Sequence, residues 1–286
     1  MRKCIRLLRI PHYLKNFLIF FPFACGKQLF TPEPWSKIIP GFLSFCLISS
    51  AIYIVNDIKD IEKDKNHPTK CKRPLASGEV SIRCAVLLMV LLMLGGATLH
   101  LLTRSHWSSW AILGAYVLLN VGYSFGLKNI PIIDICILVS GFLLRVFYGA
   151  SITAVSVSNW MYLTVMMLSF YLSLGKRRNE LIKTGDNSTR SVLKFYNKDF
   201  LDKFMYMCLS TSIVFYSLWC VDASTIQNSG NKLIFTIPFA IVLCMKYSLN
   251  IEGNSDGDPV SVILKDKVLI LLGAIFTILF GLLLYL

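Results

Sequence analysis

Long apolar runs constrain the folding of this chain more than any other feature. Nine of them follow one another, near residues 15–32, 37–57, 82–103, 107–125, 130–152, 158–175, 202–222, 232–249 and 264–286. A helix needs roughly 20 mostly apolar residues to cross a bilayer, and a water-soluble domain of 286 residues would not contain so many such runs. The pattern predicts an all-α, polytopic membrane protein with about nine transmembrane helices, forming a single integral-membrane domain over residues 1–286. The first run is the weakest, because Pro22 and Gly26 interrupt it.

Basic residues are distributed unevenly among the segments between the runs. With the N-terminus in the cytoplasm, the inner segments carry 24 Lys and Arg, the outer segments carry 4, and Arg145 within the fifth run completes the 29. An excess of Lys and Arg marks cytoplasmic loops. We therefore assign the net charge of +13 to one membrane face and expect no nucleic-acid partner. The expected protein is a multi-pass protein of the cell (inner) membrane, with the loops at 59–81, 124–130, 176–201 and 250–264 in the cytoplasm.

The polar segment NDIKDIEKDKNHPTKCKRPLASG, residues 56–78, lies where the second run meets water. If the helix continues through this exit, Asp57, Asp60 and Asp64 share one face, because residues three and four apart are neighbours on a helix. Asn56, four residues before Asp60, joins them. Stacked carboxylates repel one another unless a metal cation or basic side chains neutralise their charge. A ligand set made only of oxygens suits Mg²⁺. These four residues are therefore candidate Mg²⁺ ligands.

Basic residues complete this polar segment. Lys70, Lys72 and Arg73 follow the break that His67-Pro68 is expected to impose on the helix. Carboxylates for a metal beside cations for phosphate oxygens predict a site for a magnesium-bound diphosphate at the cytoplasmic face. The alternative is a solvated charged loop between helices. The ordered acidic face and its position at the membrane surface favour the site.

A second polar stretch, Tyr123 to Lys128, joins the fourth and fifth runs. Lys128 is the only charged residue of this short loop, and Asp134 follows within the start of the fifth run. An ionisable residue inside a membrane is costly and usually functional. Arg145 lies eleven residues further along, roughly 16 Å in a helix, and must face the protein interior. For Arg145 a structural role and a ligand-binding role both remain open.

The third polar stretch, GKRRNE at 175–180, ends the sixth run. Lys176 and Glu180 form an i, i+4 pair, and cations are favoured at a helix C-terminus. These two effects account for part of the cluster. They do not explain why this stretch falls on the cytoplasmic side together with the two before it. The last inner loop, 252–259, is acidic and Gly-rich but lacks the ligand spacing of an EF-hand.

These motifs resemble those of the UbiA superfamily of intramembrane prenyltransferases. The superfamily is recognised by NDxxDxxxD at 56–64, by YSxxLK at 123–128 and by the nine apolar runs. Four stretches resemble the branch that transfers 5-phosphoribose from phosphoribosyl pyrophosphate (PRPP) to a polyprenyl phosphate. They are YLKNFLIFFP at 13–22, HPTKxxRPLASG at 67–78, DICILVSGFLLR at 134–145 and GKRxNEL at 175–181. Other branches typically carry a second DxxxD motif after the sixth run, where this chain has basic residues instead.

The resemblance implies roles for individual residues. Magnesium on the departing diphosphate would be held by Asn56, Asp57, Asp60 and Asp64. Phosphate groups would be bound by Lys70, Arg73, Lys128, Lys176 and Arg177. The residues implied nearer the substrate are Lys15, Asn16 and Tyr123, and Asp134 is a candidate to stabilise the ribosyl transition state.

The resemblance also implies partners and leaves two rival functions open. The implied substrates are PRPP and polyprenyl phosphate, the implied surroundings are the lipid bilayer, and a homo-oligomer is compatible with this interpretation. One rival is a UbiA-type enzyme that moves a polyprenyl group from its diphosphate to an aromatic acceptor. The other is a transporter or channel, which repeated halves with paired charges would favour. We find no such repeat in the sequence.

Overall fold

The computed structural model describes residues 2–66, 70–184, 190–253 and 255–286, and every regular element in these ranges is a helix. The chain divides into two compact units, Met1–Ser156 and Val157–Leu286. Residues 67–69, on which the predicted His67-Pro68 break falls, lie outside the described ranges. The all-α prediction is confirmed for the described residues.

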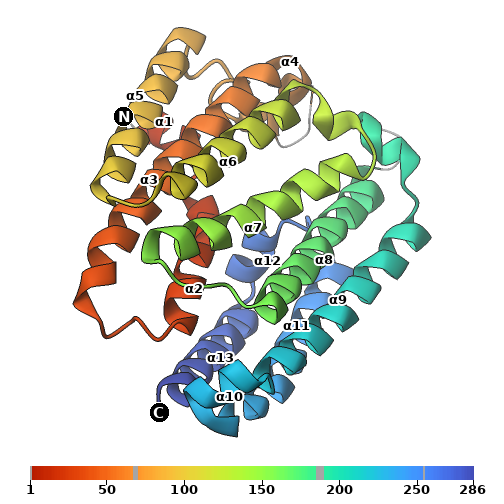
Figure 1. Ribbon diagram of the computed structural model, residues 1–286. Coiled ribbons are helices and arrows are strands. Elements are labelled where there is room, and N and C mark those ends of the chain that lie inside the picture. Colours follow the sequence, from red (N-terminus) through yellow and green to blue (C-terminus); the bar gives the residue numbers. More distant parts are fainter. Residues whose placement is uncertain (1, 67–69, 185–189, 254) are drawn as a thin grey trace. The chain divides into compact units, whose positions relative to one another are not determined.

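The first unit is built around one long helix, α3, Pro32–Lys59 (Figure 1). α3 packs along α5, Ile82–Leu102, and α6, Trp107–Phe125, packs along α7, Ile133–Thr153. The shorter elements are α1 Arg2–Leu7, η1 Ile10–Ile19, α2 Phe20–Cys25, α4 Ile61–Lys65, η2 Lys70–Lys72 and η3 Leu127–Asn129. Phe45, Tyr148 and Ile19 are fully buried in the core of this unit.

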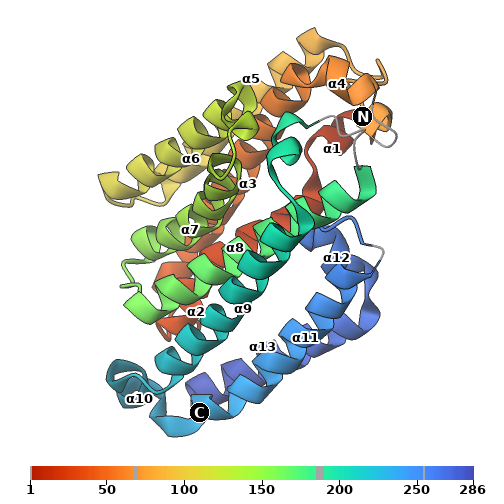
Figure 2. The ribbon, with the colours of Figure 1, turned by 90° about the vertical axis from the view of Figure 1, so that its right-hand side faces the viewer.

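The second unit contains four long helices. α8, Asn159–Thr184, runs beside α9, Lys198–Cys220, as both views show (Figures 1 and 2). α11, Ile237–Glu252, contacts α13, Lys267–Tyr285. The shorter elements are η5 Ser191–Phe195, α10 Ala223–Ser229, η6 Gly230–Thr236 and α12 Pro259–Lys265.

The predicted apolar runs coincide with long helices except at the first run. There the chain forms the 3₁₀ helix η1 followed by the short helix α2. A close approach between helices accompanies this conformation: a Cβ atom at Gly149 of α7 would lie 2.0 Å from the carbonyl oxygen of Ile19. Only glycine at position 149 therefore allows η1 to pack against α7. This tertiary contact is invisible in the hydropathy of the run.

Within the described residues, five helices are long and apolar enough to cross a membrane. They are α3, α5, α7, the continuous segment Ala223–Glu252 and α13. Their surfaces support an integral membrane protein, since large apolar side chains such as Leu94, Leu118, Met245 and Leu271 are more than half exposed. The number of nine spans and the side of the N-terminus stay predictions.

Candidate active site

The acidic segment lies at the junction of α3 and α4. α3 ends at Lys59, Asp60 leaves the helical conformation with φ −99° and ψ 7°, and α4 begins at Ile61. Two backbone hydrogen bonds bridge the junction, from Asp60 N–H to Asn56 O (3.0 Å) and from Asp64 N–H to Asp60 O (2.8 Å). The chain thus keeps a nearly helical path through the exit, as the spacing of the carboxylates predicts. The change at Asp60 nevertheless divides the acidic side chains into two groups.

Arg73 joins the first group, Asp57 and Asp64. Its Nη1 donates to Asp57 Oδ1 (3.1 Å) and to Asp64 Oδ2 (2.6 Å). Arg9 donates from Nη2 to the same oxygen of Asp57, and its guanidinium lies 5.0 Å from the centre of the Tyr53 ring. Both carboxylates are buried. Such buried charges require partners, and two arginines from distant parts of the chain supply them.

Lys128 joins the second group. Its Nζ donates to both carboxylate oxygens of Asp60, at 2.6 Å each, and Lys128 itself is buried. Ser124 Oγ also donates to Asn56 Oδ1 (3.3 Å). The two stretches singled out in the sequence, 56–64 and 123–128, therefore meet in the first unit. Ser124 was not singled out as a site residue, although it lies inside the second motif.

Arg9 is the partner that the sequence did not reveal. It belongs to the basic N-terminal segment, whose charges entered the sequence argument only through topology. Its backbone has a left-handed conformation, with φ 52° and ψ 46°, directly before η1. This turn sets the direction of the arginine relative to η1. The only sequence signal for Arg9 was its place just before an apolar run. The positive charge of cytoplasmic segments already explained that place, so Arg9 was not assigned to the site.

The remaining predicted residues of the first unit lie near these groups along the chain or further inside. Lys70 begins η2, and its carbonyl oxygen accepts a hydrogen bond from Arg73 N–H (2.9 Å). Tyr123 is half-buried one residue before Ser124. Asp134 is fully buried in the first turn of α7. Lys15 Nζ lies 6.0 Å from the centre of the Phe142 ring.

Asn16 belongs to a separate buried network around Arg145. Arg145 donates from Nε to Asn16 Oδ1 (2.8 Å), from Nη1 to Gly141 O (2.6 Å) and from Nη2 to Tyr116 OH (3.0 Å). Its guanidinium also lies 5.1 Å from the centre of the Phe45 ring. Neutral dipoles and an aromatic face thus stabilise this charge inside the first unit. Arg145 faces the interior, as the sequence predicts, and its contacts connect η1, α6 and α7.

The basic stretch 175–180 forms its own cluster in the second unit, at the cytoplasmic end predicted for α8. Lys176 Nζ donates to Asp258 Oδ1 (2.7 Å), and about one third of the lysine side chain is exposed. Arg177 is fully buried and donates to Glu180 Oε2 (2.9 Å). Glu180 also pairs with Arg190 at 3.6 Å. Lys176 is therefore the more accessible of the two predicted phosphate ligands.

Arg178 and Asn179 connect this cluster to α9 and to the C-terminal end of α11. Arg178, which is buried, donates to Asp202 Oδ1 (2.5 Å) and to Glu252 Oε2 (2.6 Å). Asn179 Nδ2 donates to Ile251 O (2.8 Å). Close packing adds to these bonds, because a Cβ atom at Gly257 would lie 2.9 Å from Lys176 Cα. Gly257 also has φ 70°, which an L-residue rarely adopts.

The acidic groups of the first unit have donor chemistry that fits Mg²⁺. Carboxylate and carboxamide oxygens are the ligands that this cation takes. Arg73 Nη1 already lies between Asp57 and Asp64, so two carboxylates converge on one cationic nitrogen. Among the described residues, no group of three or more His, Cys, Asp or Glu side chains is arranged to hold a metal ion. The donor types therefore fit magnesium, and in this conformation basic side chains neutralise them.

Known proteins resemble this chain over almost its whole length. A decaprenyl-phosphate phosphoribosyltransferase of Corynebacterium glutamicum is 33% identical over 273 residues, which cover 93% of this chain and 81% of that protein. The protein of the same name from Mycobacterium tuberculosis is 32% identical over 279 residues, covering 94% of this chain and 89% of the relative.

Solved structures agree on the fold. A UbiA homolog from Archaeoglobus fulgidus, solved bound to GPP and Mg²⁺, matches with a TM-score of 0.73 at 18% identity, covering 99% of this chain and 100% of that chain. At this identity the match concerns the fold alone. The model of the UbiA prenyltransferase family matches residues 19–262. With most of its length covered by that model and by relatives above 30% identity, the chain belongs to the UbiA prenyltransferase family.

Proposed function

We propose that this protein transfers 5-phosphoribose from PRPP to a polyprenyl phosphate and releases diphosphate. The observation that carries the proposal is the similarity, at 31–33% identity over at least 93% of the chain, to relatives named decaprenyl-phosphate phosphoribosyltransferase. The distribution of charge agrees with it. A site for PRPP must bind a diphosphate and a separate 5-phosphate. The chain has basic side chains beside the acidic segment 56–64 and again in the stretch 175–180.

The reaction needs little from the protein beyond positioning and charge. The polyprenyl phosphate is already anionic at neutral pH, so its oxygen attacks the anomeric carbon of the ribose without a strong general base. The bond from that carbon to the diphosphate breaks, and the diphosphate leaves with the electron pair. In-line attack on the α-configured donor inverts this carbon and gives a β-linked product. Binding geometry and stabilisation of the leaving group then supply most of the rate enhancement.

The residues of the first unit would hold the diphosphate end of PRPP. Magnesium, held by Asn56, Asp57, Asp60 and Asp64, would neutralise charge on the leaving diphosphate when bound. Arg73 and Lys128, which lie on these carboxylates in the structure, would turn their donors to phosphate oxygens. Asp134 would face positive charge that develops on the ribose.

The basic cluster of the second unit would hold the 5-phosphate. Lys176 is its accessible member and pairs with Asp258. Arg177 is fully buried, so its role would be to position Glu180 and the end of α8 as well as to add positive potential. A second acidic motif at this place would repel the 5-phosphate, which agrees with the basic residues found here.

We also propose the membrane arrangement in which this reaction takes place. The whole chain would act as one integral-membrane domain with about nine spans and a cytoplasmic N-terminus. The loops at 59–81, 124–130, 176–201 and 250–264 would share the cytoplasmic face, where PRPP and Mg²⁺ are available. The distribution of 24 inner and 4 outer basic residues supports this orientation.

The alternative within the family is transfer of a prenyl group to an aromatic acceptor. A 4-hydroxybenzoate octaprenyltransferase of Shewanella is 24% identical over 79% of this chain. Purified protein with Mg²⁺ should convert polyprenyl phosphate and PRPP into a phosphoribosylated lipid, detected by mass spectrometry. A second reaction should offer polyprenyl diphosphate and 4-hydroxybenzoate instead. A product only in the second reaction would replace the phosphoribosyl proposal with the alternative.

A further inference from the structure

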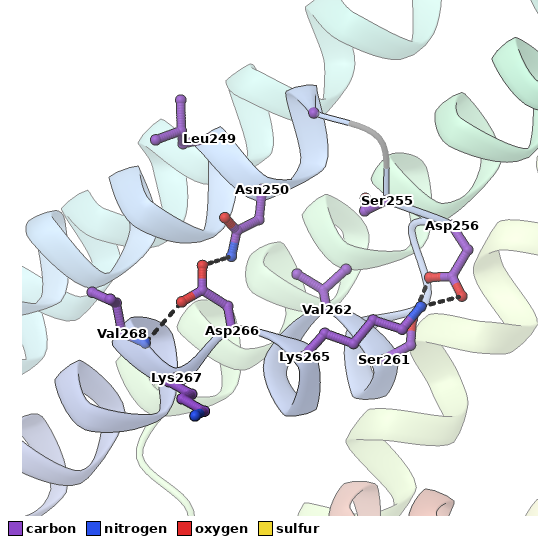
Figure 3. Close-up of a pocket in the computed structure, with 11 residues that line it drawn as sticks. Leu249, Asn250, Ser255, Asp256, Ser261, Val262, Lys265, Asp266, Lys267 and Val268 are labelled. Carbon is purple, nitrogen blue, oxygen red and sulfur yellow. Dashed lines mark hydrogen bonds and ion pairs between the residues drawn. The ribbon is translucent and has the colours of Figure 1, made fainter.

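An open pocket of about 470 Å³ lies in the second unit, where α11 ends and α13 begins (Figure 3). α12 forms its floor. The pocket is lined by side chains of two kinds, apolar ones such as Leu249 and Val268 and polar ones such as Ser261, Lys265 and Lys267. Its volume lies in the range of small-molecule binding sites. None of these residues belongs to the clusters that we assign to PRPP.

The two long helices beside the pocket are suited to lipid contact. The segment Ala223–Glu252 and α13 both have the length and hydropathy of membrane spans, and few of their residues are buried. On their surfaces Met245, Leu249 and Leu271 are each about 60% exposed or more. The pocket is at the polar ends of these helices, so it lies at the boundary between bilayer and water. The wall with Leu249 and Val268 therefore continues the apolar surface of the two helices, and the wall with Ser261 and Lys265 is polar.

The two carboxylates of the pocket are already occupied. Asp266 accepts hydrogen bonds from Lys246 Nζ (2.6 Å), from Asn250 Nδ2 (2.8 Å) and from Val268 N–H (2.8 Å). The bond from Lys246 holds the pKa of Asp266 well below its usual value. Asp256 accepts hydrogen bonds from Ser261 Oγ and from a backbone N–H (3.2 Å). Asp266 is therefore neutralised by Lys246, whereas Asp256 keeps its charge and has Lys265 as its cationic neighbour.

Two lysine side chains are available to a ligand. Lys265 is 75% exposed and lies 3.9 Å from Asp256, at the limit of an ion pair (Figure 3). Lys267 is exposed and forms no ion pair with any residue in the described ranges. Lys265 ends α12 and Lys267 begins α13. Because Lys246 already neutralises Asp266, Lys265 and Lys267 outnumber the remaining carboxylate, Asp256, and the net charge around the pocket is positive.

We propose that this pocket binds the anionic headgroup of a membrane phospholipid. The phosphate would lie on the polar side of the pocket, attracted by the charges of Lys265 and Lys267, whose side chains extend in different directions (Figure 3). The acyl chains would follow the apolar surfaces of α11 and α13. A freely soluble phosphate would not use the wall formed by Leu249 and Val268, so the apolar wall favours a lipid. Basic residues next to a membrane span are the usual means of attracting anionic lipids. The inference does not depend on the proposed transferase activity.

The test measures lipid binding to the purified full-length protein in detergent. Native mass spectrometry would compare phosphatidylglycerol with phosphatidylcholine of the same acyl chains, and with glycerol 3-phosphate as the soluble headgroup. We expect phosphatidylglycerol to bind the wild type at least ~10-fold more tightly than either of the others. Each lysine should contribute about fivefold, so Lys265→Ala with Lys267→Ala should weaken this binding about 25-fold. Both side chains are exposed, so the fold should not be affected.

Two control variants make the result specific. Lys203→Ala removes one lysine charge, as each single pocket substitution does, from an exposed position of α9 outside the pocket. It should leave binding within about twofold of the wild type. Lys265→Arg with Lys267→Arg keeps both charges and should retain binding. The proposal fails if the double alanine variant binds phosphatidylglycerol like the wild type. It also fails if Lys203→Ala weakens binding equally, or if glycerol 3-phosphate binds as tightly as the lipid.

Discussion

Lys176 and Arg178 are two residues apart on α8, yet their surroundings predict different consequences of replacement by alanine. Lys176 is one-third exposed and pairs with Asp258. Arg178 is 3% exposed and lies between Asp202 and Glu252, so it connects α8 with α9 and α11. We expect Lys176 to act on the substrate and Arg178 to act on the fold.

The expected magnitudes follow from burial. A charge-assisted phosphate contact contributes about 1.5–3 kcal/mol, so Lys176→Ala should raise the KM for PRPP about 10- to 150-fold. Its ion pair is partly exposed, and the free energy of unfolding should fall by less than about 1 kcal/mol. Breaking a buried pair costs about 3–5 kcal/mol. Since Asp202 and Glu252 keep 27% and 42% exposure, water screens part of this interaction, and Arg178→Ala should cost about 2 kcal/mol.

The assay measures two quantities for each variant. Initial rates give the KM for PRPP and for polyprenyl phosphate, and thermal unfolding in detergent gives the change in Tm. Lys194→Ala, an exposed charge outside the cluster, is the matched control and should alter neither. Lys176→Ala should change only the KM for PRPP, and Arg178→Ala should mainly lower Tm. The reasoning is refuted if Arg178→Ala raises that KM at unchanged Tm while Lys176→Ala leaves it unaltered.

Three further predictions concern the first unit. Asp57→Asn should reduce turnover at least ~100-fold with a folded protein, by the loss of a preorganised charge, and excess chelator should abolish wild-type turnover; full activity in either case would exclude the magnesium role. In a variant without native cysteines, Lys63→Cys should react with an impermeant thiol reagent only from the cytoplasm and Arg104→Cys only from outside; the reverse pattern would invert the topology. Arg145→Met should lower stability by about 1–3 kcal/mol, because Asn16 loses a buried partner, and leave both KM values unchanged; a raised KM at unchanged Tm would instead assign Arg145 to a ligand.

Hydropathy predicted most of the helices, because a run of about 20 apolar residues has few alternatives in a bilayer. The first run shows where this reasoning ends. Its residues form η1 and α2, and their conformation depends on the approach of Ile19 to Gly149, 130 positions later in the chain. No local pattern carries such a contact. The same limit applies to α4, which is separated from α3 by the single residue Asp60.

The candidate site was predictable in its residue types and less so in its pairings. The spacing of Asp57, Asp60 and Asp64 predicted a shared helical face, since that depends only on helix geometry. Their partners depend on tertiary structure: Asp60 pairs with Lys128, 68 residues away, and Asp57 with Arg9, 48 residues away. Lys128 had been singled out in the sequence, whereas Arg9 had been counted only for the topology. One sequence does not show which carboxylate each cation contacts, because that depends on how the helices pack.

The pairing of acids with bases in the first unit bears on how a substrate can enter. Ion pairs with Arg9, Arg73 and Lys128 neutralise the carboxylates of Asp57, Asp60 and Asp64. The buried cluster is therefore close to electrically neutral. Magnesium alone would add two positive charges beside these cations, which repulsion disfavours.

A magnesium diphosphate is different, because the phosphate oxygens bring the negative charge that Arg73 and Lys128 need when they leave the carboxylates. The cluster should therefore bind metal and donor together and bind the metal weakly by itself. Calorimetry that found tight Mg²⁺ binding without PRPP would contradict this coupling, and a metal affinity that rises with PRPP concentration would support it.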